Sequence, residues 1–120
     1  MWMARTSTLR VLALWMLSAL LAVASGPGFR SRAQLDEHFE KHGSEFGNIT
    51  KAQYLALAQD LRDAPAGGPV LEAVREDGVI SRFDRTHGYF GVFNPDRTIR
   101  TFFVPADGER YFRRQARRRH

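Results

Sequence analysis

Two histidines, His38 and His42, lie four residues apart in this chain, and Lys41 immediately precedes the second of them. Histidine gains and loses a proton near neutral pH, so two of them together can serve as a general acid and a general base. The lysine ammonium group adds a positive charge that suits an anionic substrate. The chemistry that this spacing favours is therefore proton transfer beside a charged group such as a phosphate.

A single amphipathic helix over residues 31–47 would position these side chains. Three apolar residues share one face of that helix at helical spacing: Leu35, Phe39 and Phe46. On the same wheel, His42 falls inside the apolar stripe, whereas His38 and Lys41 lie along its edge. A helix that only filled a core would carry leucine or alanine at position 42, whereas a histidine there is held rigidly and stays reachable. The other interpretation of His42 is a core histidine bonded to a backbone carbonyl.

A strand over residues 98–104 supplies a second group of candidates, because it places a guanidinium and a hydroxyl among apolar neighbours. Strict alternation gives this strand two faces, one with Ile99, Thr101 and Phe103 and one with Arg100, Phe102 and Val104. The Thr101 hydroxyl either faces the histidines across the sheet or belongs to a residue that simply favours strands. Arg100 needs an anionic partner, which is Asp84 or Glu72 within the sheet or else a bound phosphate.

Hydrophobic periodicity predicts the elements around these groups. Capping-box spacing at Ser31 with Gln34 and at Thr50 with Gln53 predicts the starts of two helices. The period then changes to two, which predicts four strands, over residues 70–75, 79–84, 89–93 and 98–104. A short helix over residues 108–117 would close the domain. The expected fold class is α+β, with two N-terminal helices packed on one face of a four-stranded antiparallel meander and a short C-terminal helix.

Two segments carry a resemblance to known nucleases, LDEHFEKHGSEFG at residues 35–47 and DRTIRTFF at residues 96–103. With the helix and the meander between them, they resemble the catalytic domain of colicin D. More broadly, the chain resembles the barnase–EndoU–colicin–RelE superfamily of metal-independent ribonucleases over about residues 35–115. By position in the Lys-His motif, the resemblance implies that His42 is the essential acid or base and that Lys41 acts beside it.

The resemblance also bears on the last strand. In that family a serine, two residues before an aromatic residue, contacts the phosphate, and the matching positions here are Thr101 and Phe103. Threonine keeps the hydroxyl donor and adds a methyl group. Phenylalanine stands where the family has tryptophan, so it keeps a stacking face and loses the indole N–H.

An endoribonuclease of this kind, acting on RNA including tRNA, needs no metal and no cofactor, because the 2′-hydroxyl of RNA is the nucleophile. One group removes the 2′-hydroxyl proton and another protonates the 5′-oxygen, which leaves a 2′,3′-cyclic phosphate. We expect His38 to be the second acid or base, and Arg100, Lys41 and the Thr101 hydroxyl to hold the phosphate oxygens. This requires His42 and Thr101 to meet at one positively lined cleft. The expected substrate-binding residues are Phe103, Tyr111 and Arg82.

Residues 1–26 have the pattern of a Sec-type signal peptide. A region with two arginines precedes an apolar run over residues 11–24, and an Ala-x-Ala cleavage signature ends at Ala24. That run is shorter than the roughly 18–20 residues of a membrane-spanning helix, and an uncleaved anchor is the alternative. We expect a secreted or periplasmic single domain over residues 27–120, without a stable membrane anchor after cleavage. The chain has no cysteine, which excludes disulfides.

The formal net charge is +5, and five arginines crowd the last eight residues, which form a basic tail from about residue 113. Arginine suits bidentate contacts with phosphate, although a basic tail is also often only a solvated chain end. The expected partners are RNA and an acidic immunity protein, and the expected state is a monomer. Two alternatives stay open. One is an exported, non-catalytic binding module that uses the same scaffold and tail, and the other is a metal site of His38 and His42 with Glu45 or His87.

Overall fold

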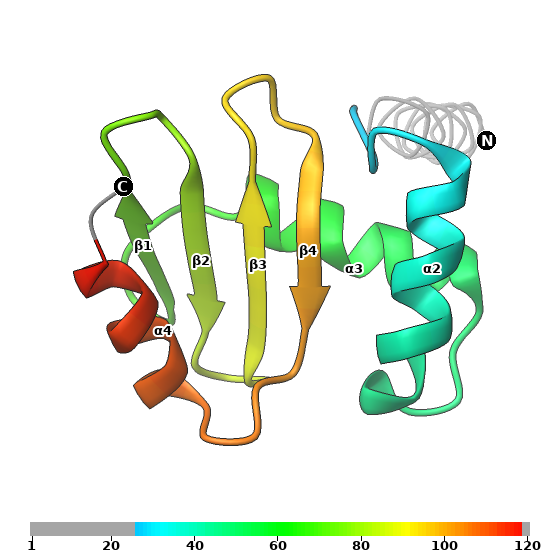
Figure 1. Ribbon diagram of the computed structural model, residues 1–120. Coiled ribbons are helices and arrows are strands. Elements are labelled where there is room, and N and C mark those ends of the chain that lie inside the picture. Colours follow the sequence, from blue (N-terminus) through cyan, green and yellow to red (C-terminus); the bar gives the residue numbers. More distant parts are fainter. Residues whose placement is uncertain (1–25, 119–120) are drawn as a thin grey trace, which may run out of the picture.

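The computed structural model describes residues 26–118, and Figure 1 shows how their helices and strands are arranged. The order of elements is α2 (Arg32–His42), the short 3₁₀ helix η1 (Gly43–Phe46), α3 (Lys51–Asp63), β1 (Val70–Val74), β2 (Ile80–Asp84), β3 (Tyr89–Phe93), β4 (Ile99–Phe103) and α4 (Glu109–Arg117). The signal peptide expected over residues 1–26 lies, apart from Gly26, outside the described residues.

The four strands form one antiparallel sheet in the order β1-β2-β3-β4, which is a simple meander. Each strand begins and ends within one residue of the expected bounds. The turn between β1 and β2 is typical of the connections, because Gly78 has a φ of 84° and the Asp77 carboxylate accepts a hydrogen bond from the Val79 amide. With two helices before the sheet and a short helix after it, the α+β fold class is confirmed.

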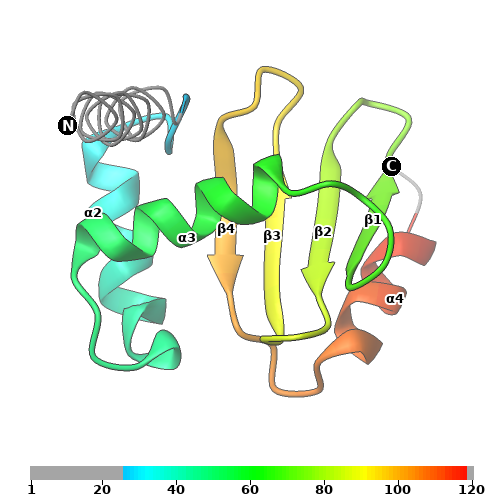
Figure 2. The same ribbon diagram turned by 180° about the vertical axis from the view of Figure 1, so that it is seen from behind.

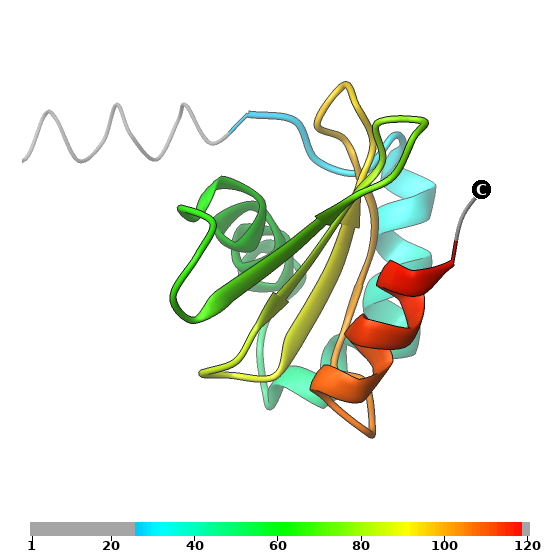
Figure 3. The same cartoon turned by 90° about the vertical axis from the view of Figure 1, so that its left-hand side faces the viewer.

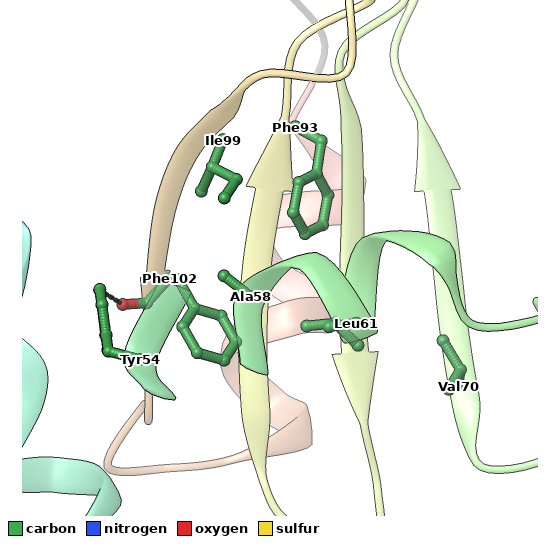
Figure 4. Packing of buried hydrophobic residues seen from close by; sticks show 7 residues of the cluster. All are labelled: Tyr54, Ala58, Leu61, Val70, Phe93, Ile99 and Phe102. Carbon is green, nitrogen blue, oxygen red and sulfur yellow. Dashed lines mark hydrogen bonds between the residues drawn. The ribbon is translucent and has the colours of Figure 1, made fainter. Parts of the chain in front are cut away.

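Each face of the sheet has its own hydrophobic core. Helix α3 crosses the strands on one face, as Figure 2 shows, and it packs there around the fully buried Tyr54 and Phe102. Figure 4 shows this first cluster: Tyr54, Ala58, Leu61, Val70, Phe93, Ile99 and Phe102. The opposite face carries a second cluster of Phe83, Phe90 and Phe112 under α4.

Helix α4 lies on the side of the sheet away from α3 (Figure 3). The physical reason is strand alternation, which directs Phe83 and Phe90 away from α3 and leaves an apolar surface on the second face. Phe112 of α4 covers that surface. As a result, the sheet is enclosed between α3 and α4.

Helix α2 lies beside the edge strand β4, where the chain segment before it also joins the sheet (Figure 1). The Ile99 amide donates a hydrogen bond to the Gly28 carbonyl, 2.9 Å away, and Phe29 forms a parallel bridge with Ile99. Leu35 and Phe39 turn the apolar side of α2 toward the first cluster. The histidine side chains of α2 are therefore carried on a helix that is anchored to β4 from both ends.

The single helix expected over residues 31–47 is wrong beyond His42, where the chain tightens into the 3₁₀ helix η1. A Cβ atom at Gly43 would lie 2.6 Å from the Phe39 ring, so the position of this ring depends on the lack of a side chain at residue 43. The cap at Ser31 accepts from the Gln34 amide, as predicted. The full reciprocal capping box forms at the start of α3.

Strict alternation along β4 is also wrong. Val92 pairs with Thr101, and the next residue, Phe93, pairs with Ile99, so Arg100 is an extra residue in a β-bulge. The bulge places Ile99 with Phe102 in the first cluster, whereas Phe103 packs with the second. Thr101 therefore shares a face with Phe103 but not with Ile99.

Gly91 lies on β3 where Leu61 of α3 packs against the sheet. A Cβ atom there would lie 2.7 Å from the Phe93 ring and 3.2 Å from Leu61. The Gly91→Ala variant should therefore unfold with a free energy lower by about 1–3 kcal/mol, the usual cost of overpacking. Urea unfolding measures this, with Val74→Ala as a control because Val74 is 62% exposed. Equal stability of Gly91→Ala and wild type would contradict this packing.

Candidate active site

His42, the last residue of α2, is held from two sides. Its Nδ1 lies 2.8 Å from the Glu45 carboxylate, and its ring stacks on Phe103 with centroids 5.1 Å apart. The His42 side chain is 16% exposed, so solvent reaches the ring. The interpretation of His42 as a core histidine bonded to a backbone carbonyl is wrong, because its partner is a carboxylate. Because a carboxylate accepts, Nδ1 is the donor in this contact, and Nε2 has no hydrogen-bond partner among the described residues.

Glu45 is a site residue that the sequence analysis considered only as a possible metal ligand. One carboxylate oxygen accepts from His42, and the other accepts from the Val104 amide at 2.9 Å. Glu45 thereby ties the histidine to the end of β4. The spacing of three residues between His42 and Glu45 could have indicated this contact from the sequence, because residues three apart on a helical segment are neighbours.

His38 lies one turn before His42, and the two ring centroids are 6.2 Å apart. Its ring also stacks on Phe29, which the segment before α2 supplies. Burial is the main cause that lowers the pKa of His38 below the ordinary value of 6.5; the nearby His42 and Lys41 add to this, and Glu37 opposes it. His38 Nδ1 is buried without a hydrogen-bond partner among the described residues. A neutral imidazole at neutral pH is the form that accepts a proton.

The lowered pKa of His38 predicts a pH dependence of stability. As the pH falls, His38 takes up a proton in the unfolded chain before it does so in the folded protein. The contribution of His38 to the free energy of unfolding is therefore fully present above about pH 6.5, and it is lost as the pH falls through the pKa of His38 in the folded protein. The His38→Phe variant keeps a ring against Phe29 and removes the titration. Urea unfolding at pH values on either side of this window should show that wild type loses more stability on acidification than the variant. Equal losses would contradict the shift.

A continuous row of half-buried rings runs from the segment before α2 across β4 to α4. Its members are Phe29, His38, His42, Phe103 and Tyr111. Phe103 and Tyr111 meet edge to face at 5.4 Å, and the Arg114 guanidinium lies over the Tyr111 ring. Unpaired bases of RNA stack on such rings. The structure thus brings four of the predicted residues, His38, His42, Phe103 and Tyr111, into one row.

Arg100 and Thr101 border different hollows. The first, the Arg100 hollow, has a volume of about 270 Å³ and is lined by His38, Arg30, Gln34, Glu37, Asn94, Ile99 and Arg100. The second, the Thr101 hollow, is about 80 Å³ and is lined by Arg75, Ser81, Phe90, Val92, Thr101, Tyr111 and Gln115. His42 does not line the Thr101 hollow, so the expectation that His42 and Thr101 meet at one positively lined cleft is wrong. The residue of this face of β4 that contacts the His42 ring is Phe103.

Two cations, Arg100 and Lys41, line hollows together with His38. Arg100 donates from Nε to the Asn94 side chain at 3.0 Å, and within residues 26–118 it pairs with neither Asp84 nor Glu72. Lys41 is exposed and forms no ion pair in the same part of the chain. Both cations are thus available to an anion from solvent.

Arg82 lies apart from this group. Its guanidinium donates to the Glu72 carboxylate at 2.6 Å and to the backbone carbonyls of Leu61 and Ala64 at the end of α3. Only 12% of the Arg82 side chain is exposed. The structure therefore gives Arg82 a role in joining α3 to the sheet, on the face opposite Phe103.

The predicted basic tail is partly helical and partly neutralised. Glu109 pairs with Arg85 and Arg113, and these two contacts lower the pKa of Glu109 to about 2. Asp107 pairs with Arg114. Residues 110, 117 and 118, all arginines, stay exposed without an ion pair in the described chain. They leave a smaller positive surface than the sequence alone indicates.

The alternative metal site finds no support in the geometry. Among residues 26–118, no three His, Cys, Asp or Glu side chains come together so that they could hold a metal ion. His87 pairs with Asp84 at 2.6 Å and stacks on Tyr89, away from the other histidines. None of the described helices is both long enough and apolar enough to cross a membrane.

Comparison with known proteins adds no assignment, because the sequence matches no protein-family model and no curated protein. The chemical interpretation of the site therefore depends on its own geometry.

Proposed function

We propose that this chain is a metal-independent endoribonuclease, of the kind found in colicin D-like toxins. The observation that carries the proposal is the pair of histidines on α2, whose ring centroids are 6.2 Å apart. The Glu45 carboxylate orients the His42 ring, and burial lowers the pKa of His38, which favours its neutral form. A phosphodiester that is cleaved by its own 2′-hydroxyl requires two such groups, one to remove a proton and one to supply it.

The proposed reaction is a transesterification at phosphorus that is accompanied by two proton transfers. One imidazole takes the 2′-hydroxyl proton while the 2′-oxygen forms a bond to phosphorus. The bond from phosphorus to the 5′-oxygen breaks, and the second imidazole gives its proton to that oxygen. The products are a 2′,3′-cyclic phosphate and a 5′-hydroxyl. Glu45 keeps the His42 ring in the orientation and tautomer that this exchange needs.

The remaining side chains bind the substrate. Lys41 and Arg100 line hollows with His38, form no ion pair among the described residues, and suit the negative charge that develops on the phosphate. The rings of Phe103 and Tyr111 offer stacking surfaces to the adjoining bases. The proposal includes an exported, monomeric protein that acts on RNA, tRNA included, and an acidic immunity protein as its partner.

The direct test is to incubate the purified protein with total RNA in the presence of EDTA and to analyse the ends of the fragments. Cleavage with 2′,3′-cyclic phosphate and 5′-hydroxyl ends is expected. RNA that stays intact, or cleavage that requires a divalent metal, would overturn the proposal. Binding of RNA without cleavage would instead support the alternative of a non-catalytic binding module.

The role of Glu45 makes a separate prediction. The Glu45→Gln variant keeps an oxygen for the Val104 amide and loses the carboxylate at His42 Nδ1. We expect kcat to fall by about 10²–10⁴-fold with little change in KM, because the glutamine amide can donate to Nδ1 and hold the ring in the wrong tautomer while the ring itself stays in place. Steady-state kinetics on an oligoribonucleotide separate the two constants. A rise in KM at constant kcat would show that Glu45 acts in binding instead.

A further inference from the structure

Helix α4 covers the ends of β1 and β2 incompletely and leaves a hollow of about 380 Å³, here called the α4 hollow. Its polar lining consists of Arg75, Glu76, Ser81, Gln115 and Arg118. Three of these residues, Arg75, Ser81 and Gln115, also line the Thr101 hollow. The two hollows are therefore neighbours. They lie on the face of the sheet that α4 covers, and Figures 1 and 3 show the position of α4 on that face.

Arg75 brings hydrogen-bond donors to this place that the protein does not use. Its Nη2 donates to the Asp77 carboxylate at 2.8 Å, but its Nε is buried without a partner among the described residues. Buried donors are nearly always paired, because a donor removed from water without an acceptor is costly. Because Arg75 also lines the α4 hollow, a ligand there can supply an acceptor to the terminal N–H groups of this guanidinium.

The Thr101 hollow and two ring contacts lie between the α4 hollow and His42. Tyr111 lines the neighbouring Thr101 hollow and meets Phe103, which in turn stacks on His42. A strand of RNA whose phosphate lies at His42 can therefore follow Phe103 and Tyr111 and place an adjoining base under α4.

We propose that the α4 hollow binds a guanine of the RNA and that Arg75 determines this specificity. The proposal rests on the proposed function. Guanine presents two adjacent acceptors, O6 and N7, on one edge, and arginine donors recognise this edge more often than any other base feature. Adenine has an amino group where guanine has O6. This amino group is a hydrogen-bond donor, so it cannot accept from the guanidinium. Glu76, the acid on the rim, suits the N–H groups on the other edge of guanine.

Binding can be tested without cleavage by using short 2′-O-methyl oligouridines, which lack a free 2′-hydroxyl, labelled with a fluorophore. Each carries one central guanine, hypoxanthine or adenine, and fluorescence anisotropy gives the dissociation constants for the full-length protein. Guanine and hypoxanthine, which both have O6 and N7, should bind about tenfold more tightly than adenine. In a parallel digest of mixed-sequence RNA, cleavage should be enriched beside guanine.

The Arg75→Lys variant keeps the charge and loses the planar donors, so its preference for guanine should fall to within about twofold. Asp77→Asn is the matched control, because it removes the ion pair with Arg75 and leaves the guanidinium in place, so its preference for guanine should persist. Gln115→Ala, on an exposed helix, should weaken the preference as well. Circular dichroism confirms that each variant is folded.

The outcomes separate this inference from the proposed function. Equal binding of the three bases by wild type, or a preference that persists in Arg75→Lys, overturns the guanine site even if RNA is cleaved. A guanine preference that depends on Arg75, in a protein that leaves RNA intact, supports the base site and overturns the nuclease.

Discussion

Replacement of His42 by alanine is expected to lower the rate of RNA cleavage by about 10²–10⁴-fold, the contribution of one general acid or base. The variant removes the ring that Glu45 orients and Phe103 supports, whereas Glu45 can still accept from the Val104 amide. The fold should survive, because the ring lies at the surface end of α2 and no buried hydrophobic cluster includes it. Initial rates on a fluorogenic oligoribonucleotide in EDTA measure the effect.

The chain offers a matched control for this experiment. His87 pairs with a carboxylate three residues away and stacks on a ring, as His42 does, but its partners are Asp84 and Tyr89. His87→Ala should therefore cleave RNA at the wild-type rate. If both variants lose activity equally, the loss reports a structural change, and if neither loses activity, the catalytic centre is not on α2.

The regular elements could be predicted because their sequence patterns are local. In α3, the capping box at Thr50 and the apolar spacing of Tyr54, Ala58 and Leu61 fix both the start of the helix and its buried side. The strands follow from alternation in the same way. The bulge at Arg100 could not be read from β4 alone, because it depends on how β4 pairs with β3.

The candidate site was predictable in part for the same reason. The histidines of α2 and the aromatic Phe103 follow from their own segments, whereas the contact between His42 and Phe103 requires α2 to pack along β4. The bond from Glu45 to Val104 joins residues that are far apart in the sequence. The position of α4 decided which side chains border a hollow, so Arg75 was not among the predicted residues.

The division of β4 between two faces has a measurable consequence, because neighbouring phenylalanines serve different purposes. Phe102 is fully buried in the first cluster, and Tyr54 donates to its backbone carbonyl. Phe103, one residue on, is half-buried and faces His42 and Tyr111. One side chain therefore belongs to the core and the other to the site.

Phe102→Ala is expected to lower the free energy of unfolding by about 3–5 kcal/mol, because it leaves a cavity between α3 and the sheet. For a small domain this is a large part of the total stability. Phe103→Ala should cost clearly less stability but should weaken binding of RNA, since one stacked base contributes about 1–3 kcal/mol. Urea unfolding and anisotropy with a 2′-O-methyl oligonucleotide measure the two quantities. If Phe103→Ala destabilises the protein as strongly as Phe102→Ala and leaves RNA binding unchanged, the row of rings beside His42 is part of the core, and no stacking surface for RNA exists there.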